Sequence, residues 1–409
     1  MNDWAAWWCD CRSPCGSLGF SIILGFANEE YFMSCFRCCH GVSSHGGNIK
    51  FAGSCAAVWL LLASSTGFSQ QQIDAAKVVG REACGKCHAA ELGAWQVSKH
   101  GKNAWDLLDH PKAPDFAKSL GIAAGDIKSE KSVCTKCHGT HQQTGGKLVI
   151  AKGNSCESCH GGAGGDQGWL TVHSDYGKGA AGTLAELLKQ REGEPAAHLA
   201  TRKAATSKAG MNRAEDAVKI ASNCLQCHIV PNEKLIAAGH PSSDKFEFVE
   251  WAQGEVRHNF LLDSKENAEV PSLWLASGKG RTAKGRKQLM FVAGQLADLV
   301  LSLRIRAGVT SAKRGTLGDL VNDRIDDAID EVEDAEIDEL APVLAIMKEN
   351  KIKKSTLKKT TPGDKELYSG AADAVQAVAD AFVAKYKDAT GLPASVKPPR
   401  KSKGKAFKG

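Results

Sequence analysis

Cys84-Gly-Lys-Cys87-His88 is the first of four stretches of one form in this 409-residue chain. The others are Cys134-Thr-Lys-Cys137-His138, Cys156-Glu-Ser-Cys159-His160 and Cys224-Leu-Gln-Cys227-His228, and beyond Cys55 every cysteine lies in one of the four. Two cysteines separated by two residues and followed at once by histidine are the attachment signature of c-type haem. The thiols bond the porphyrin, and the histidine binds the iron as its proximal ligand. We therefore predict four covalently bound haem c groups, with His88, His138, His160 and His228 as proximal ligands.

Other sites built from cysteine pairs fit this pattern less well. A structural zinc site needs four ligands and gives no reason for a histidine directly after each pair. A thioredoxin-like redox pair occurs once, near a strand–helix–strand pattern. A disulfide framework predicts cysteines scattered along the chain, whereas eight cysteines here are confined to one motif.

Residues 1–69 differ from the rest of the chain. Residues 1–48 contain no lysine, and an apolar run of 13 residues, 51–63, follows Lys50. This run has the length of a signal-peptide core and is shorter than the roughly 20 residues of a membrane span. We expect translation to start near Val42 and cleavage to follow Ser69; an uncleaved signal anchor is the alternative. Either way the haem region lies outside the cytoplasm, in the periplasm or otherwise exported. We expect no functional role for the cysteines of this leader, Cys9, Cys11, Cys15, Cys35, Cys38, Cys39 and Cys55.

The net charge of the chain gives little information about its partners. The formal charge is +6, and removal of residues 1–69 leaves 49 basic and 42 acidic residues, or +7. Four haems add about eight propionates, which bring the loaded protein close to neutrality. We expect no nucleic-acid partner. The hydrophobic and charged contents, 43% and 24%, are ordinary for a globular protein.

All four motifs lie in the predicted haem domain, residues 70–283. Their first cysteines are spaced by 50, 22 and 68 residues. The spacing of 22 is too short for a separate module, so we expect the second and third haems to be close neighbours. Glycine-rich loops such as residues 161–165 let the backbone approach a flat cofactor closely. We predict a mainly α fold, with helices and loops wrapped around stacked haems.

A different region, residues 284–390, follows the haem domain. Apolar residues recur there at three- and four-residue spacing from Leu289 to Leu303 and again from Leu320 to Leu340, as in amphipathic helices. With a further helix over residues 364–388, we predict a helical hairpin or bundle that packs against the haem domain. The chain has no histidine after His258, so this region supplies no histidine ligand. The basic tail, residues 391–409, is expected to be disordered.

The sixth ligand of each iron decides between electron transfer and chemistry, because an iron with two histidine ligands has no open position. Seven histidines lie outside the motifs and the leader. His100 lies 12 residues after His88 on an expected helix, and proline follows His240 and restricts its backbone. Our candidate distal ligands are His100, His173, His240 and His258.

The remaining histidines fit other roles. We expect His110, which precedes a proline, and His198, which lies among alanines, to face solvent. His141 is too close to His138 to reach over its own haem, so it is expected to bind a neighbouring haem or to line a distal pocket. Met211 is a weaker alternative ligand.

Four stretches carry a resemblance to a known family: the first Cys-x-x-Cys-His unit, Trp95-x-x-Ser98-x-His100, Cys156-Glu-Ser-Cys159-His160-Gly161 and Gly239-His240-Pro241. Over residues 80–260 the chain resembles the tetrahaem cytochrome c-554 family. This family is related to hydroxylamine oxidoreductase and the pentahaem nitrite reductases. The resemblance implies an electron carrier with closely stacked haem pairs, and the best-known member has one five-coordinate haem. It also implies distal ligation by His100, His173 and His240, with an open iron at His138. His258 departs from the family pattern and could close that site.

Eleven acidic residues and one basic residue, Arg324, lie between Asp319 and Glu339. One interpretation is a docking face for a basic redox partner, guided by electrostatic attraction. The other is a solvated helix face balanced by the lysines that follow, and we prefer it.

Two functional hypotheses follow. The first is a periplasmic cytochrome that passes electrons singly between redox proteins, and the second is a haem enzyme acting on nitric oxide, hydroxylamine or nitrite at one five-coordinate haem. The chain has no Cys-x-x-Cys-Lys motif, which nitrite reductases of this group often use, and only three tyrosines beyond residue 69. We therefore favour electron transfer over catalysis, and assign no catalytic residue. Peripheral membrane association and the oligomeric state are left open.

Overall fold

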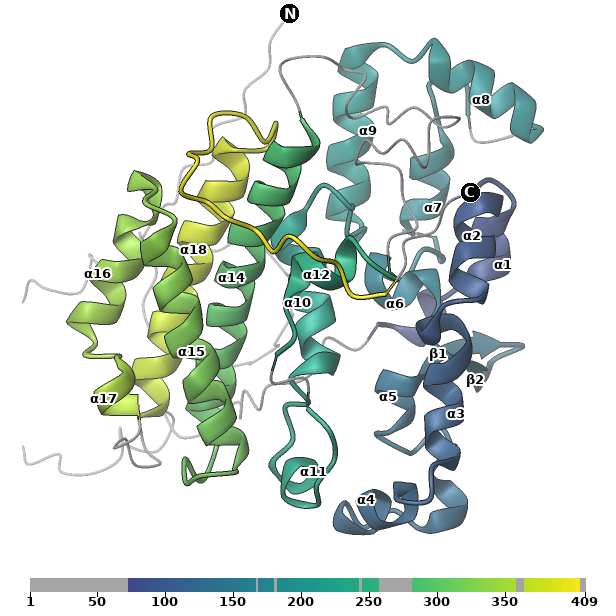
Figure 1. Cartoon of the computed structure of the whole chain (residues 1–409). Coiled ribbons are helices and arrows are strands. Elements are labelled where there is room, and N and C mark those ends of the chain that lie inside the picture. The colour runs from purple at the N-terminus through teal and green to yellow at the C-terminus, as the bar shows by residue number, and fades with distance from the viewer. Residues whose placement is uncertain are drawn as a thin grey trace, which may run out of the picture. The chain divides into compact units, whose positions relative to one another are not determined.

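The computed structural model describes residues 73–404, apart from residues 167, 180–181, 243–244, 257–281 and 358–363. The described residues belong to one compact unit, Ser65–Gly409. They are mainly helical, which confirms the predicted fold class (Figure 1). The predicted leader and the candidate ligand His258 lie outside the described residues.

The part of the chain that carries the motifs is built from short helices joined by loops. The first three motifs lie in or beside helices of eight residues or fewer, and the fourth lies at the C-terminal end of the 12-residue α10. The helices in chain order are η3 (Ala75–Lys77), α1 (Arg81–Gly85), α2 (Ala89–Gln96), η4 (Lys99–Asn103), α3 (Ala104–Asp106), η5 (Leu107–Asp109), α4 (Ala113–Ser119), η6 (Ala124–Asp126), α5 (Thr135–His138), α6 (Cys156–His160), α7 (Trp169–Ser174), α8 (Leu184–Glu192), α9 (Ala196–Lys208), α10 (Ala217–His228), α11 (Glu233–Ala237) and α12 (Phe248–Ala252).

A two-stranded antiparallel hairpin joins the second motif to the third. Strand β1 (Gly139–Thr144) begins directly after His138, and β2 (Lys147–Lys152) ends shortly before Cys156. The turn residues Gly145 and Gly146 both have positive φ, 58° and 75°, as a tight two-residue hairpin turn requires. Because Gly139 pairs with Lys152, the hairpin returns the chain to where it left the second motif.

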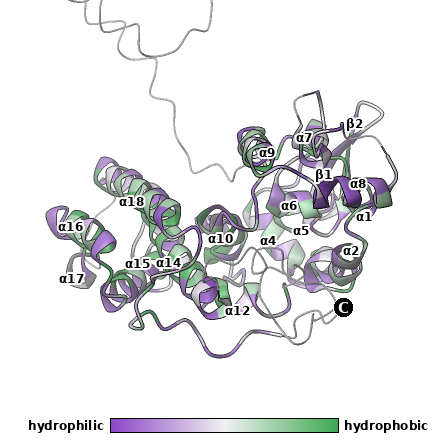
Figure 2. Ribbon diagram, turned by 90° about the horizontal axis from the view of Figure 1, so that it is seen from above, coloured by the Kyte–Doolittle hydropathy of each residue, from purple (hydrophilic) through white to green (hydrophobic). Residues whose placement is uncertain are grey.

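The C-terminal region is a helical bundle centred on α14 (Ala283–Gly308). Around it lie α15 (Leu317–Asp334), η8 (Asp338–Leu340), α16 (Ala341–Glu349), α17 (Lys354–Leu357) and α18 (Lys365–Lys385). Leu289, Leu296, Leu299 and Leu303 of α14 are fully buried, as their spacing predicted. Helices α15 and α18 pack on α14, and so does α10, which carries the fourth motif. Figure 2 shows hydrophobic residues of these helices facing one another and hydrophilic residues on the outside.

Helix α14 has the length and hydropathy of a membrane span, but 83% of its apolar window is buried inside the protein. It is the one such helix among the residues that the structure describes. Its apolar composition is accounted for by the helices packed around it, as in the core helix of a bundle.

Two predictions for this region need correction. The expected single helix over 320–340 ends at Asp334, because Glu336 adopts a left-handed backbone conformation with φ of 51°, and a separate helix, α16, follows. The tail was expected to be disordered, but it packs on the bundle near Val396, and Lys403 exchanges backbone hydrogen bonds with Glu250 and Glu255 at and after α12. Gln288 Nε2 donates to the carbonyl oxygens of Pro393 and Val396, 2.9 and 3.1 Å away, and Val396 is buried.

Candidate haem-binding site

Each motif is wound into one helical turn. In the first, the amides of Cys87 and His88 both donate to the carbonyl oxygen of Cys84, and the second motif repeats this with Cys134 as the acceptor. Residues three apart in a helical turn lie on the same side, so each turn presents its two thiols together. The eight described cysteines are all free of disulfide bonds. The turns therefore have the conformation that attachment of one macrocycle needs.

The four motifs meet through their thiols. Cys84 of the first motif hydrogen-bonds Cys156 of the third, and this bond, with burial, raises the pKa of Cys84. Cys227 of the fourth motif hydrogen-bonds Cys137 of the second, which raises the pKa of Cys227 in the same way. Burial raises the pKa of Cys159 to about 11. The motifs, dispersed over 145 residues of sequence, thus bring their cysteines close together.

Three motif histidines face histidines from elsewhere in the chain. The ring centroids of His88 and His173 are 6.2 Å apart, those of His228 and His100 are 5.9 Å apart, and those of His138 and His240 are 6.4 Å apart. An imidazole nitrogen binds a metal at roughly 2 Å and lies about 1 Å from its ring centroid, so two rings on opposite sides of one iron are about 6 Å apart. All three separations fit an iron between the rings.

Burial and hydrogen bonds prepare these histidines to bind metal. Burial lowers the pKa of His173 to about 3 and that of His228 to about 4, so both rings are neutral at neutral pH, as ligation requires. The Nδ1 atoms of His138 and His160 lie 2.8 Å from the carbonyl oxygens of Ala104 and Asn212. These bonds orient the rings and leave Nε2 available.

Residues 83–161 match the family model described as cytochrome c554 and c-prime, which covers the first three motifs. The segment that carries the first three motifs is therefore similar to cytochrome c554. The match supports a c-type cytochrome with covalently bound haem c that takes part in electron transfer. No curated protein and no solved structure matches the chain.

Aromatic side chains line the histidine pairs of this cytochrome. The ring of Phe246 stacks on His228, with centroids 4.4 Å apart and planes 19° apart, and Trp95 stacks on His100 at 5.4 Å. Close packing also explains Gly101, because a Cβ atom there would lie 2.2 Å from the carbonyl oxygen of Trp95. Aromatic surroundings of this kind suit a flat apolar cofactor.

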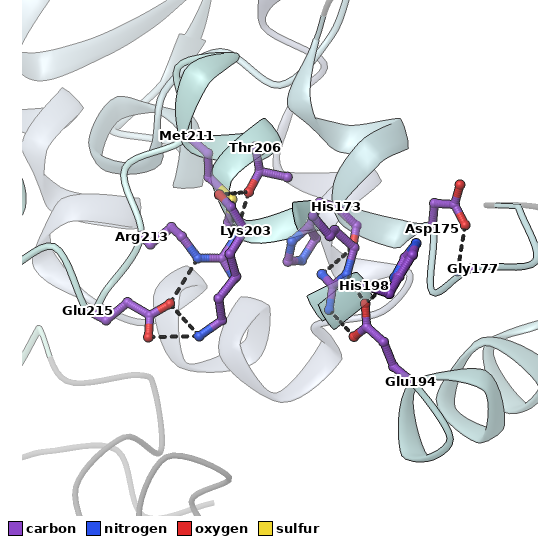
Figure 3. A network of polar contacts seen from close by, with 11 residues as sticks. His173, Asp175, Gly177, Glu194, His198, Lys203, Thr206, Met211, Arg213 and Glu215 are labelled. Atoms are coloured by element: carbon purple, nitrogen blue, oxygen red, sulfur yellow. Dashed lines mark hydrogen bonds and ion pairs between the residues drawn. The ribbon is translucent and has the colours of Figure 1, made fainter. Parts of the chain in front are cut away.

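A polar network surrounds His173 (Figure 3). Arg202 donates to the carbonyl oxygen of His173 at 2.9 Å, and its Nε and Nη2 atoms bond both carboxylate oxygens of Glu194. The His198 Nδ1 atom lies 2.7 Å from Glu194. The Nδ1 atom of His173 is itself buried and has no hydrogen-bond partner among the described residues. A buried ring nitrogen without a hydrogen-bond partner is able to bind a metal.

The structure places the other histidines in different roles. His110 is exposed, as predicted, whereas His198 is only partly exposed because it pairs with Glu194. His141 lies on β1, where its Nε2 atom is 2.9 Å from the hydroxyl of Thr135 in the second motif. The Met211 sulfur accepts a hydrogen bond from Arg213.

The open position that the family resemblance implies at His138 stays a prediction. The ring of His240 lies near His138 at a separation that fits an iron between them. His258, the candidate that could close that site, lies outside the described residues. Its role as a distal ligand stays a prediction.

Several residues that shape the site carry no sequence signal of their own. Phe246 packs against His228 from 18 residues away, and Asn212 and Asn223 both donate to the carbonyl oxygen of Cys159. Glu157, inside the third motif, is fully buried. Its position within the motif was visible in the sequence, but its burial became evident only in the fold.

Proposed function

We propose that this protein is an exported tetrahaem cytochrome that passes electrons one at a time through closely spaced, mostly bis-histidine haems between redox proteins. The observation that supports it best is the set of three facing histidine pairs at 5.9–6.4 Å. A bis-histidine iron has no position for a substrate, so such pairs favour electron transfer over catalysis.

The residues have distinct roles in this proposal. The eight motif cysteines hold four haems, whose irons supply one-electron chemistry when bound. His88, His138, His160 and His228 are the proximal ligands. The distal ligands are His173 opposite His88, His240 opposite His138, and His100 opposite His228. We keep His258 as a proposed distal ligand. The thiol contacts between motifs support haem spacings short enough for electron tunnelling.

We also propose that residues 1–69 are removed on export to the periplasm or an equivalent compartment, where c-type haem is attached. The 13-residue apolar run before Ser69 supports this proposal. N-terminal sequencing of the mature protein is expected to begin at residue 70, and retention of residues 1–48 would contradict it.

The proposed partners are an electron donor and an electron acceptor. The outer face of α15 is a candidate docking surface, because Asp323, Asp327, Asp330 and Asp334 recur at helical spacing and are exposed. The one basic residue within this acidic stretch, Arg324, is buried against Asp298 and lies away from that face. A solvated helix face remains the competing explanation.

Electron paramagnetic resonance of the oxidised protein, with a pyridine-haemochrome count, tests the proposal. We expect four haems per chain and four low-spin signals. A high-spin signal that shifts on adding nitric oxide or hydroxylamine would instead favour the alternative, a haem enzyme acting on a small nitrogen compound at one five-coordinate iron. A count below four would refute the tetrahaem assignment.

A further inference from the structure

Glu157 is the second residue of the third motif and lies in α6, between Cys156 and Cys159. Its exposed fraction is 0%, and it is among the largest fully buried side chains of the chain. Carboxylates are rarely buried to this extent without a partner that balances their charge. Its position between two haem-attachment cysteines therefore calls for an explanation.

The partners of this carboxylate are all backbone amides. Oε1 accepts hydrogen bonds from Val79 N at 2.9 Å and Ala163 N at 3.0 Å, and Oε2 accepts one from Gly80 N at 2.9 Å. No ion pair to Glu157 is formed within the described part of the chain. Three N–H donors suit an ionised carboxylate, which only accepts hydrogen bonds. The negative charge is thus held by amide dipoles and is not cancelled by a cation.

These contacts join the third motif to the segment that leads into the first. Val79 and Gly80 directly precede α1, which carries Cys84, and Ala163 follows the third motif. A second link lies beside them, where Gly164 N donates to Lys77 O at 2.6 Å. The side chains of Cys84 and Cys156 are in contact at the same junction. Glu157 is therefore placed where it fixes the distance between two haem-attachment turns.

The charge of Glu157 acts on both turns. The pKa of Cys84 is raised by its hydrogen bond with Cys156, by burial, and by the charges on Cys156 and Glu157. Glu157 also acts to raise the pKa of Cys156, although the hydrogen bond with Cys84 lowers it overall. A buried anion stabilises the more positive state of a nearby iron, which is the ferric state.

We propose that Glu157 is a positioning residue that clamps the first haem motif onto the third, and that its buried charge lowers the reduction potentials of the haems held there. The inference rests on the proposed function, because it requires haem at both motifs. On this inference, Glu157 lowers the reduction potentials of the first and third haems and does not lower those of the second and fourth haems.

Redox titration of the haem-loaded Glu157→Gln variant, followed by visible absorption, tests this inference. Glutamine keeps the size of the side chain and removes its charge. A unit charge acting over about 10 Å at an effective dielectric constant of about 20 changes an equilibrium about tenfold. We therefore expect the reduced-to-oxidised ratio of two of the four haems to rise about tenfold at a fixed potential, equivalent to 59 mV for a one-electron couple. The other two haems are expected to keep their potentials.

Two further variants separate charge from packing. Glu366→Gln removes an exposed acid from α18 and is expected to leave all potentials unchanged. Glu157→Asp keeps the charge but shortens the side chain, so it is expected to lower thermal stability while retaining potentials closer to those of the wild type. Wild-type potentials in fully loaded Glu157→Gln would overturn the inference, and so would an equal shift of all four haems.

If Glu157→Gln loses haem, mass mapping of its peptides still decides the matter. Loss confined to the first and third motifs supports the clamp, whereas loss at the other motifs, or at all four, contradicts it. The haem count of the wild-type chain is a separate test. A wild type without four haems refutes the proposed function, while unchanged potentials in a loaded variant refute only the role of Glu157.

Discussion

Replacing His240 with alanine is expected to convert one iron of this cytochrome from a six-coordinate, low-spin state to a five-coordinate, high-spin state. The His240 and His138 rings are 6.4 Å apart, close to the roughly 6 Å that two ligands of one iron require. Alanine has no side-chain nitrogen, so the iron at His138 would lose its proposed distal ligand. If the chain carries the four proposed haems, one quarter of the low-spin signal should be lost.

The measurement combines paramagnetic resonance of the oxidised protein with carbon monoxide binding to the reduced protein. We expect one high-spin signal and about one equivalent of carbon monoxide bound per chain, because an open ferrous position accepts a small ligand. The chain offers a matched control in His110→Ala. His110 also precedes a proline, but it is exposed and its ring accepts a hydrogen bond only from Lys112 N. That variant should keep the wild-type spectrum.

Retention of four low-spin irons in His240→Ala would refute the assignment of His240, whatever the effect on electron-transfer rate. A spin change of equal size in both variants would also refute it, because it would show that the loss of a histidine before proline disturbs the fold in general. Replacement of His240 also removes a contact with Phe116, whose ring centroid is 5.1 Å away. Loss of this ring contact should lower the free energy of unfolding by about 0.5–1.5 kcal/mol, which should leave the fold intact.

Three further predictions follow from the charged groups. Asp298→Asn should lower the free energy of unfolding by about 3–5 kcal/mol, measured by denaturant titration, because it removes the charge of the carboxylate that binds the buried Arg324 guanidinium. Acid should destabilise the haem-free chain below about pH 6.5, because burial lowers the pKa of His173 to about 3 and that of His228 to about 4. Between these values and pH 6.5 the unfolded state binds more protons than the folded state, so the free energy of unfolding falls as the pH falls. A free energy of unfolding that stays constant down to pH 4 would contradict this prediction. Asp330→Lys should slow electron transfer to a basic partner at low salt and have little effect at high salt if α15 is a docking surface, whereas equal rates at both salt concentrations would favour the solvated face.

The sequence was most informative where chemistry constrains spacing. The four Cys-x-x-Cys-His units predicted the sites of haem attachment. In the structure the first and second units each form a helical turn, closed by backbone hydrogen bonds to the carbonyl oxygens of Cys84 and Cys134. The stripe from Leu289 to Leu303 predicted the buried core helix α14 for a similar reason, because a helix packed on several sides must repeat apolar residues at its own period. Both patterns are local, so a single sequence displays them.

Contacts between distant segments could not be predicted in this way. Nothing in the sequence relates His228 to His100, or Cys84 to Cys156, because the pairing depends on how the loops between them fold. The hairpin after His138 was also missed, since β1 contains no apolar alternation and its signal is limited to Gly145 and Gly146. Glu157 illustrates the same limit: its three amide donors come from segments on both sides of its motif.

The C-terminal helices, which lie outside the matched family segment, are part of the environment of the fourth motif. Arg324 of α15 donates to the carbonyl oxygen of Phe246 at 3.2 Å, and Phe246 stacks on His228. Helix α10 carries that histidine at its C-terminal end, and it buries Ala221 and Leu225 in the same core as α14. These helices supply no histidine ligand, yet they set the packing and the nearby charges around one proposed iron. Because burial and nearby charge set a haem's reduction potential, this region would give the proposed fourth haem an environment different from that beside Glu157.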